Sequence, residues 1–240
     1  MKTLEEVELG FRNPDRENFP GYSYPPTFRP MRMTDSSLLA PIVRRDAKSI
    51  RTFLGSFQNA HLWNLKSAQA FVASRLNSDE FPNFHYLFFC GPELVGMGSL
   101  APYGNDPMDC QIILAVFGSH QAKGWGEAIA KTLKGIAFQI WGFNRIVWIN
   151  DATNLASSKL AQKIGAHLEE VYEDDFILGE NGTGLWYRWA VDRPHERLAP
   201  GIFQGASIEY WSQPKSSGLL QRVVASQKNA HDLDATKLPS

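Results

Sequence analysis

The segment that most constrains the fold of this chain runs from residue 110 to residue 150. It begins with a run at 110–117 that is apolar apart from one glutamine and is typical of a buried strand. After a loop that contains glycine, apolar residues recur at steps of four, three and four, the spacing of one helix face: Ile129, Leu133, Ile136 and Ile140. A second short apolar run follows at 145–150. The segment therefore predicts a strand, a helix and a second strand in succession.

The residues before this segment predict one strand and two helices. The first strand is expected either at 28–31 or at 38–43, and the sequence does not choose between them. A helix is expected to begin at Asp46. A second helix is expected over 67–76, with Ser67 as its N-cap because a serine hydroxyl accepts from an N–H group of the first turn.

Four further runs have strand character, at 85–90, 93–100, 166–172 and 185–191. The first two flank a Gly-Pro dipeptide and predict a β-hairpin, whereas the last two predict the closing strands of the sheet. A helix from Asn154 to Gly165 is expected between the strand at 145–150 and these closing strands. The chain therefore divides into an extended N-terminal arm at 1–27, one folded domain at 28–195 and a polar C-terminal tail at 196–240.

The composition argues against several classes of protein. The net charge is −1 at pH 7, so no global positive field attracts nucleic acid. No apolar run approaches the roughly 20 residues of a transmembrane helix, and the polar N-terminus is unlike a signal peptide. The two cysteines lie among apolar residues and the six histidines lack metal-ligand spacing, so neither a disulfide framework nor a metal site is expected. We expect a cytoplasmic protein that does not associate with membranes.

The loop between the strand expected at 110–117 and the helix that follows it has the composition of a phosphate-binding turn. Its residues are Gln121, Ala122, Lys123, Gly124, Trp125 and Gly126. Glycines let the backbone approach a ligand closely, and a helix N-terminus offers N–H groups and a positive dipole end to a pyrophosphate. A glycine-rich turn also begins many helices that bind no ligand, so the loop alone does not establish a site.

Two common phosphate-binding motifs fit this loop poorly. A P-loop has a lysine directly after its second glycine, where this chain has Trp125. A dinucleotide-binding fingerprint has its first glycine directly after the strand and a third glycine where this chain has Ile129. Asp151 does follow the next strand, as that fingerprint requires. A Rossmann-like nucleotide-binding module therefore stays open as a weaker alternative.

A third motif fits better. Gln-x-x-Gly-x-Gly at 121–126 resembles the coenzyme A-binding motif of the GNAT acetyltransferase superfamily, and the segment 154–166 resembles the Asn-x-x-Ser helix and turn of its RimJ/RimL-like branch. The resemblance covers about 28–193. It implies an α/β fold, in which a central mixed sheet has splayed parallel strands 4 and 5 and is flanked by helices. It also implies an enzyme that transfers the acetyl group of acetyl-CoA directly to a primary amine in a ternary complex.

The resemblance assigns cofactor-binding roles to residues of both motifs. The pantetheine arm would lie along the backbone of Val116 and Phe117, and the pyrophosphate would meet the N–H groups of 121–126. Lys123 would either add positive charge to a phosphate or be a solvated loop residue. Asn154 would bind the coenzyme arm, serve as the N-cap of its helix, or do both.

The catalytic residues are less well specified. Ser157 either protonates the departing thiolate or makes only a local backbone bond. Many relatives have a glutamate base where this chain has Gln111, which cannot accept a proton, and a tyrosine acid where it has Ala161. Asp109 lies two residues before Gln111 and, by the period of a strand, faces the same side, so it is the candidate base.

These departures leave a second class of function open. A catalytically silent coenzyme A-binding or scaffold protein of the same fold would also lack the usual base and acid. The acceptor is not specified either, and a protein N-terminus and a small amine both remain candidates, as does a homodimer. The acidic run at 169–175 either attracts a cationic amine or is a solvated strand edge.

Overall fold

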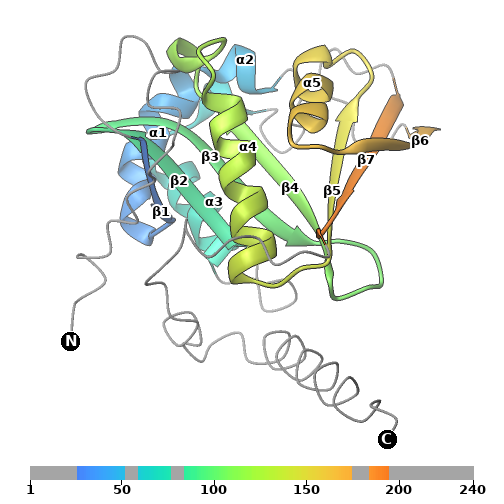
Figure 1. Ribbon diagram of the computed structural model, residues 1–240. Helices are drawn as coiled ribbons and strands as arrows, with labels where there is room; N and C mark the ends of the chain where they lie inside the picture. The colour runs from blue at the N-terminus through green and yellow to red at the C-terminus, as the bar shows by residue number, and fades with distance from the viewer. Residues whose placement is uncertain (1–25, 52–58, 77–83, 175–183, 195–240) are drawn as a thin grey trace, which may run out of the picture.

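The strand, helix and second strand expected between residues 110 and 150 all form. The computed structural model describes residues 26–51, 59–76, 84–174 and 184–194. Their strands make one mixed sheet in the order β1-β2-β3-β4-β5-β7-β6 (Figure 1). The strands are β1 (Pro26–Pro30), β2 (Phe84–Cys90), β3 (Glu93–Pro102), β4 (Asp109–Val116), β5 (Arg145–Asp151), β6 (His167–Glu173) and β7 (Leu185–Asp192).

Among the described strands, β4 and β5 are the one parallel pair. Their paired residues are Asp109 with Arg145, Cys110 with Ile146 and Gln111 with Val147. Beyond the last of these pairs the two strands continue without pairing to each other, although each stays paired to its outer neighbour as far as its last residue. The strands therefore splay toward their carboxyl ends. The predicted mixed sheet is confirmed, whereas a Rossmann-like module would need a mostly parallel sheet.

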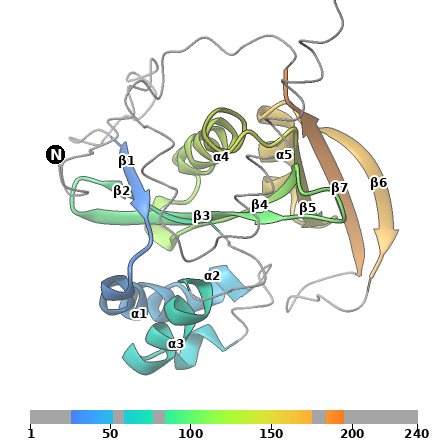
Figure 2. The ribbon, with the colours of Figure 1, turned by 90° about the horizontal axis from the view of Figure 1, so that it is seen from below.

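Helices cover both faces of the sheet (Figure 2). One face carries α4 (Trp125–Gly135) and α5 (Leu155–Lys163), and the other carries α1 (Ser36–Arg45), α2 (Ala47–Arg51) and α3 (Leu65–Leu76). A π-helix at Ile136–Ile140 continues α4, and short 3₁₀ turns lie at Met33–Asp35, Ala60–Leu62 and Gly118–His120. None of the described helices is long and apolar enough to cross a bilayer.

The inner face of α4 packs closely on β3 and β4. Ile129 and Leu133 are at most 1% exposed, as their helical spacing predicts. Two glycines of β3 make the approach possible. A Cβ atom at Gly96 would lie 2.6 Å from the carbonyl oxygen of Ala115, and one at Gly98 would lie 2.5 Å from Leu133 Cδ1. A larger side chain at either position would separate helix and sheet, so the placement of α4 depends on these glycines.

Two local predictions need correction. The run 38–43 does not form the first strand, which is β1, the other expected position; it lies inside α1. Leu39 and Val43 are fully buried and lie four residues apart, the spacing of one helix face. Burial of that face therefore favours a helix over a strand at 38–43. Ser67 is not the N-cap of α3, because its own N–H group donates to Asn64 Oδ1 at 3.0 Å. Asn64 caps the helix instead, three residues earlier than the expected N-cap.

The remaining sequence-based elements are confirmed within the described part of the chain. The hairpin is β2–β3, the closing strands are β6 and β7, and the helix expected from Asp46 begins at Ala47. The N-terminal arm at 1–27 lies almost entirely outside the described residues, and the tail at 196–240 lies wholly outside them. The proposed domain boundaries therefore stay predictions.

The close approach of α4 to β3 predicts unequal effects of two alanine substitutions. Gly96→Ala places a methyl group against a backbone oxygen that cannot rotate away, and we expect it to lower the free energy of unfolding by about 1–3 kcal/mol. Gly98→Ala is the matched control, because its methyl group meets the end of a flexible leucine side chain and the expected loss is smaller. Chemical denaturation measures both losses, and a larger loss for Gly98→Ala would contradict the argument.

Candidate functional site

The carboxyl end of β4 exposes backbone groups toward the splay. The Phe117 N–H donates to the Val95 carbonyl at 2.9 Å, so the backbone of Phe117 is directed toward β3. Because backbone groups alternate along a strand, those of Leu114 and Val116 are directed to the opposite side, where β5 no longer pairs. Val116 is therefore placed where a bound chain could pair with it, while the Phe117 N–H is already used. Leu114 is a further residue whose backbone groups could pair with a bound molecule, and the alternation of residues along a strand could have indicated it.

Gln121 ties the loop to the end of β4. Its side-chain Nε2 donates to the Val116 carbonyl at 3.0 Å, and its backbone N–H donates to the Gly118 carbonyl at 3.1 Å. The Gln121 N–H is thus not among the groups that a phosphate would meet, and the residue shapes the loop instead. Lys123, two residues further on, carries an exposed side chain on the same loop.

The backbone turns left-handed twice before α4 begins. Ala122 has φ 58° and Gly124 has φ 85°, and Ala122 is the one non-glycine residue with positive φ in the described part of the chain. Turns of this kind gather N–H groups into a concavity that suits an anion. The first intrahelical bond runs from the Ala128 N–H to the Gly124 carbonyl at 3.2 Å. The N–H groups of 125–127 therefore precede the hydrogen-bonded ladder of α4 and lie at its positive end.

Trp125 and Gly126 place α4 rather than present side chains to a ligand. Trp125 is 1% exposed and belongs to the main core. A Cβ atom at Gly126 would lie 3.0 Å from Leu160 Cδ1, so the glycine lets α5 approach the start of α4. An ion pair between Glu127 and Lys163 joins the same two helices. The two helices are thus held together beside the splayed strands (Figure 1).

Asn154 and Ser157 form the first turn of α5. Asn154 Oδ1 accepts from the Ser157 N–H at 3.1 Å, which confirms Asn154 as the N-cap and leaves its amide nitrogen as a further donor. Ser157 Oγ accepts from Trp148 Nε1 at 2.8 Å. Trp148 is the first residue of β5 after the last pair with β4, so Ser157 lies where the strands begin to separate.

A buried polar network lies beside this turn and links β5, β7 and α5. Asn150 Nδ2 donates to Ser158 Oγ at 3.0 Å, and Trp189 Nε1 donates to Asn150 Oδ1 at 3.1 Å. Asp151, the residue that a dinucleotide fingerprint would use, accepts from the Thr153 N–H at 2.8 Å. Its carboxylate is buried and shapes the turn into α5.

Asp109 lies at the paired end of β4, away from the splay. Its Oδ2 is 3.9 Å from Arg145 Nε, and Arg145 also forms ion pairs with Glu169 and with Asp192, the latter at 3.2 Å. Burial, followed by the charge of Asp106, raises the pKa of Asp109 above the ordinary carboxyl value. A raised pKa suits a general base, because it brings proton affinity closer to neutral pH. The role of Asp109 as the base stays a prediction.

Asp109 and Gln111 share the sheet face that is turned away from α4 and α5. The neighbouring Cys110 belongs to the core under α4, so the alternate residues of β4 point to the other face, where Ile113 is 40% exposed. On β7 and β6 the same face carries Arg188, whose guanidinium is 2.8 Å from Glu170 Oε2. An acceptor approaching the splay from this face would meet polar and charged side chains.

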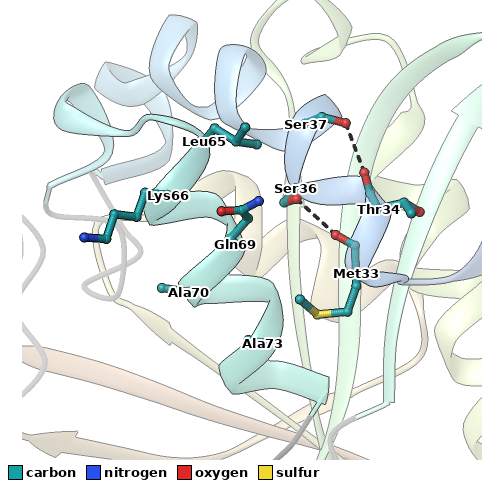
Figure 3. A pocket seen from close by; sticks show the side chains of 9 residues that line it. All are labelled: Met33, Thr34, Ser36, Ser37, Leu65, Lys66, Gln69, Ala70 and Ala73. Atoms are coloured by element: carbon teal, nitrogen blue, oxygen red, sulfur yellow. Dashed lines mark hydrogen bonds between the residues drawn. The ribbon is translucent and has the colours of Figure 1, made fainter.

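A separate groove of about 840 Å³ lies between α1 and α3 (Figure 3). It is lined by Met33, Thr34, Ser36, Ser37, Leu65, Lys66, Gln69, Ala70 and Ala73. Both serine hydroxyls donate to backbone carbonyls of the preceding turn at 3.0 Å. Lys66 is the one ionisable side chain in this lining. The groove belongs to the α1–α3 side of the sheet and holds none of the predicted site residues.

The residues around the splay can bind an elongated molecule with an anionic end. The N–H groups at the start of α4 suit phosphates, and the free side of β4 can pair with an extended chain as another strand would. Ser157 supplies a hydroxyl where the strands separate. The residues that the structure describes contain no cluster of three His, Cys, Asp or Glu side chains that could hold a metal ion.

Comparison with known proteins identifies a fold that carries this arrangement. A family model described as an acetyltransferase (GNAT) domain matches residues 27–167. A search of curated proteins finds no sequence that matches the chain. Among solved structures, the chain resembles RimL, a ribosomal L7/L12 alpha-N-protein acetyltransferase in complex with coenzyme A. That match has a TM-score of 0.62 and 17% identity, and it covers 73% of this chain and 97% of RimL.

Two further solved structures share the fold. RimJ of Mycobacterium smegmatis, in complex with CoA-disulfide, matches with a TM-score of 0.62 and 14% identity over 85% of this chain and 90% of RimJ. A spermidine N-acetyltransferase of Vibrio cholerae, in complex with CoA and spermine, matches with a TM-score of 0.58 and 14% identity over 70% of this chain and 95% of its own. Identities this low show a common fold, whereas the family model covers more than half of the chain. The chain therefore belongs to the GNAT acetyltransferase family and is an acyltransferase.

Proposed function

We propose that this protein is an N-acetyltransferase that takes the acetyl group from acetyl-CoA and transfers it to a primary amine. The observation that carries the proposal is the combination, at one end of the sheet, of splayed β4 and β5 with the left-handed turns before α4. The coenzymes named in the RimL, RimJ and spermidine acetyltransferase structures support the same assignment.

The residues of the loop and of β4 would divide the binding of acetyl-CoA between them. The N–H groups from Ala122 to Gly126 would hold the pyrophosphate, with Lys123 adding positive charge. The backbone groups of Leu114 and the N–H group of Val116 would pair with the amides of the pantetheine arm, as a neighbouring strand would, since the Val116 carbonyl already accepts from Gln121. The side-chain amide of Asn154 would add one donor from the start of α5.

The chemistry would follow from holding the two reactants together. The neutral amine attacks the thioester carbonyl, a C–N bond forms, and the C–S bond then breaks to release a thiolate. The Ser157 hydroxyl donates a proton to that thiolate and is reprotonated from water, while the attacking nitrogen loses its proton to Asp109 through water. The route through water is required because Asp109 lies two residues before the point where the strands separate.

The acceptor would be a protein N-terminus or a small amine. These are the acceptor types in the names of RimL and the spermidine acetyltransferase. The sheet face around Gln111 carries Asp109, Glu169 and Glu170, which would favour a cationic approach over an anionic one.

A catalytically silent coenzyme-binding protein is the second candidate, because Gln111 occupies the β4 position where many relatives carry a glutamate. The two candidates differ in one measurement. The enzyme releases free thiol from acetyl-CoA when supplied with a panel of peptide N-termini and polyamines, whereas a silent protein binds acetyl-CoA and releases none.

Removal of the charge at position 123 should weaken coenzyme binding. We expect Lys123→Ala to raise the dissociation constant of acetyl-CoA about two- to fivefold, the size of an exposed ion pair, with a smaller effect at high salt. Isothermal titration measures this. Lys131→Ala is the control, because Lys131 pairs with Glu127 at 2.8 Å further along α4. An equal rise of the dissociation constant in both variants would mean that the overall positive charge of this region, and not a contact from the loop, attracts acetyl-CoA.

Removal of the Ser157 hydroxyl should slow the chemical step. We expect Ser157→Ala to lower kcat about tenfold, a modest effect for a general acid because a thiolate is a weak base, with little change in KM for acetyl-CoA. Ser158→Ala is the matched control, since the neighbouring hydroxyl accepts from Asn150 and serves the buried network. It should lower thermal stability and leave kcat within about twofold. Comparable kcat losses in both variants would count against the acid role.

Substitution of Asp109 tests the proposed base. We expect Asp109→Asn to lower kcat/KM for the amine about ten- to a hundredfold at pH values above the raised pKa of Asp109, where the carboxylate can accept a proton and the amide cannot. Asp192→Asn removes another carboxylate from Arg145 and should have little effect. If both variants lose activity equally, the loss comes from the Arg145 ion pairs and not from a missing base.

A further inference from the structure

We infer that Trp148 is a positioning residue for acetyl transfer: its indole N–H holds the Ser157 hydroxyl so that the serine hydrogen is directed toward the leaving sulfur. The inference rests on the proposed function, because it concerns the same proton donor. It adds a residue of β5 to the reaction, although no property of the sequence around Trp148 marks it as anything but an apolar core residue.

Two hydrogen bonds hold Ser157, one at its side chain and one at its backbone. Trp148 Nε1 donates to Ser157 Oγ at 2.8 Å, and the Ser157 backbone N–H donates to Asn154 Oδ1 at 3.1 Å. Trp148 is only 4% exposed, so its ring is held by the surrounding core and cannot turn freely. The donor that reaches Ser157 is therefore rigid, and the serine rotamer is set by a fixed partner.

The direction of the hydroxyl hydrogen follows from the chemistry of the two groups. An indole nitrogen can only donate, so Ser157 Oγ must accept through a lone pair and direct its own hydrogen elsewhere. Several other helical hydroxyls of this protein donate back to a carbonyl of the preceding turn, as Thr132 does to Ala128 at 2.8 Å. No such acceptor is assigned to the Ser157 hydroxyl among the described residues, which leaves its hydrogen available to another group.

The location of the contact connects it with the reaction. Pairing between β4 and β5 ends at Gln111 and Val147, and Trp148 is the next residue of β5. The indole thus bridges from the point of strand separation to the first turn of α5. A donated N–H bond also stabilises the partial negative charge that develops on Oγ as the serine gives up its proton.

Trp189 provides a matched comparison within the same core. It lies directly opposite Trp148 in the β5–β7 ladder, is 6% exposed, and donates its indole N–H to Asn150 Oδ1 at 3.1 Å. Both tryptophans therefore combine a buried ring with one hydrogen bond to a side-chain oxygen. They differ in that the Trp148 bond ends on the proposed proton donor.

The experiment compares Trp148→Phe, Trp189→Phe, Ser157→Ala and the double variant Trp148→Phe/Ser157→Ala in the full chain. Thiol release from acetyl-CoA with an acceptor amine gives kcat and KM, and thermal unfolding reports stability. We expect Trp148→Phe to lower kcat about three- to tenfold, the size of one hydrogen bond, with KM for acetyl-CoA within about twofold. Trp189→Phe should lower stability and leave kcat nearly unchanged. The double variant should be no slower than Ser157→Ala, because the indole acts through the serine.

Five results would overturn the inference. One is an equal kcat for Trp148→Phe and Trp189→Phe. Another is a kcat for the double variant that is reduced by the product of the two single-variant factors. If Trp148→Phe does not fold, benzothienylalanine at position 148 keeps the bicyclic ring and removes only the donor, and full activity of that protein is the third. A wild-type protein that releases no thiol with any amine defeats the proposed function and this inference together. Wild-type turnover with an unaffected Trp148→Phe defeats the inference alone.

Discussion

Pairing between β4 and β5 ends at Gln111 and Val147, and the arrangement of the loop and helices around the sheet centre follows from this early end. Each strand keeps its outer neighbour to its last residue, β3 for β4 and β7 for β5, so the sheet remains continuous while its centre opens. Unpaired backbone groups are costly when buried and useful when a ligand can pair with them. The splay therefore creates a binding edge in the middle of a sheet, where a regular ladder would have none.

The helices α4 and α5 begin beside this opening in the sheet. Gly96 and Gly98 let α4 lie close on β3, which brings the start of α4 to the carboxyl end of β4. Gly126 then lets α5 approach α4, so the N-termini of both helices serve the same region. These three positions without a Cβ atom thus bring the left-handed turn before α4 and the first turn of α5, which carries the Ser157 hydroxyl, to the same end of the sheet.

Several features followed from local patterns in the sequence. The helical spacing from Ile129 onward predicted α4, and the N-cap character of Asn154 predicted the start of α5; both depend on interactions within a few residues. The same local reasoning failed for 38–43, because an apolar run of that length suits a strand or a buried helix face equally well. It also misplaced the start of α3, since Asn64 and Ser67 are both good N-caps and only the backbone path decides between them.

Motif spacing and periodicity are properties of contiguous residues, so the strand and helix pattern and the loop at the start of α4 could be read from the chain, and the two motifs together supplied the resemblance to the family. Packing settled which groups of these motifs are available. It showed that the Phe117 and Gln121 N–H groups are used internally, that Asp109 lies at the paired end of β4, and that Trp148 reaches Ser157. Each of these depends on which strand or helix turn lies opposite a residue, and that is set by packing between segments distant in the chain.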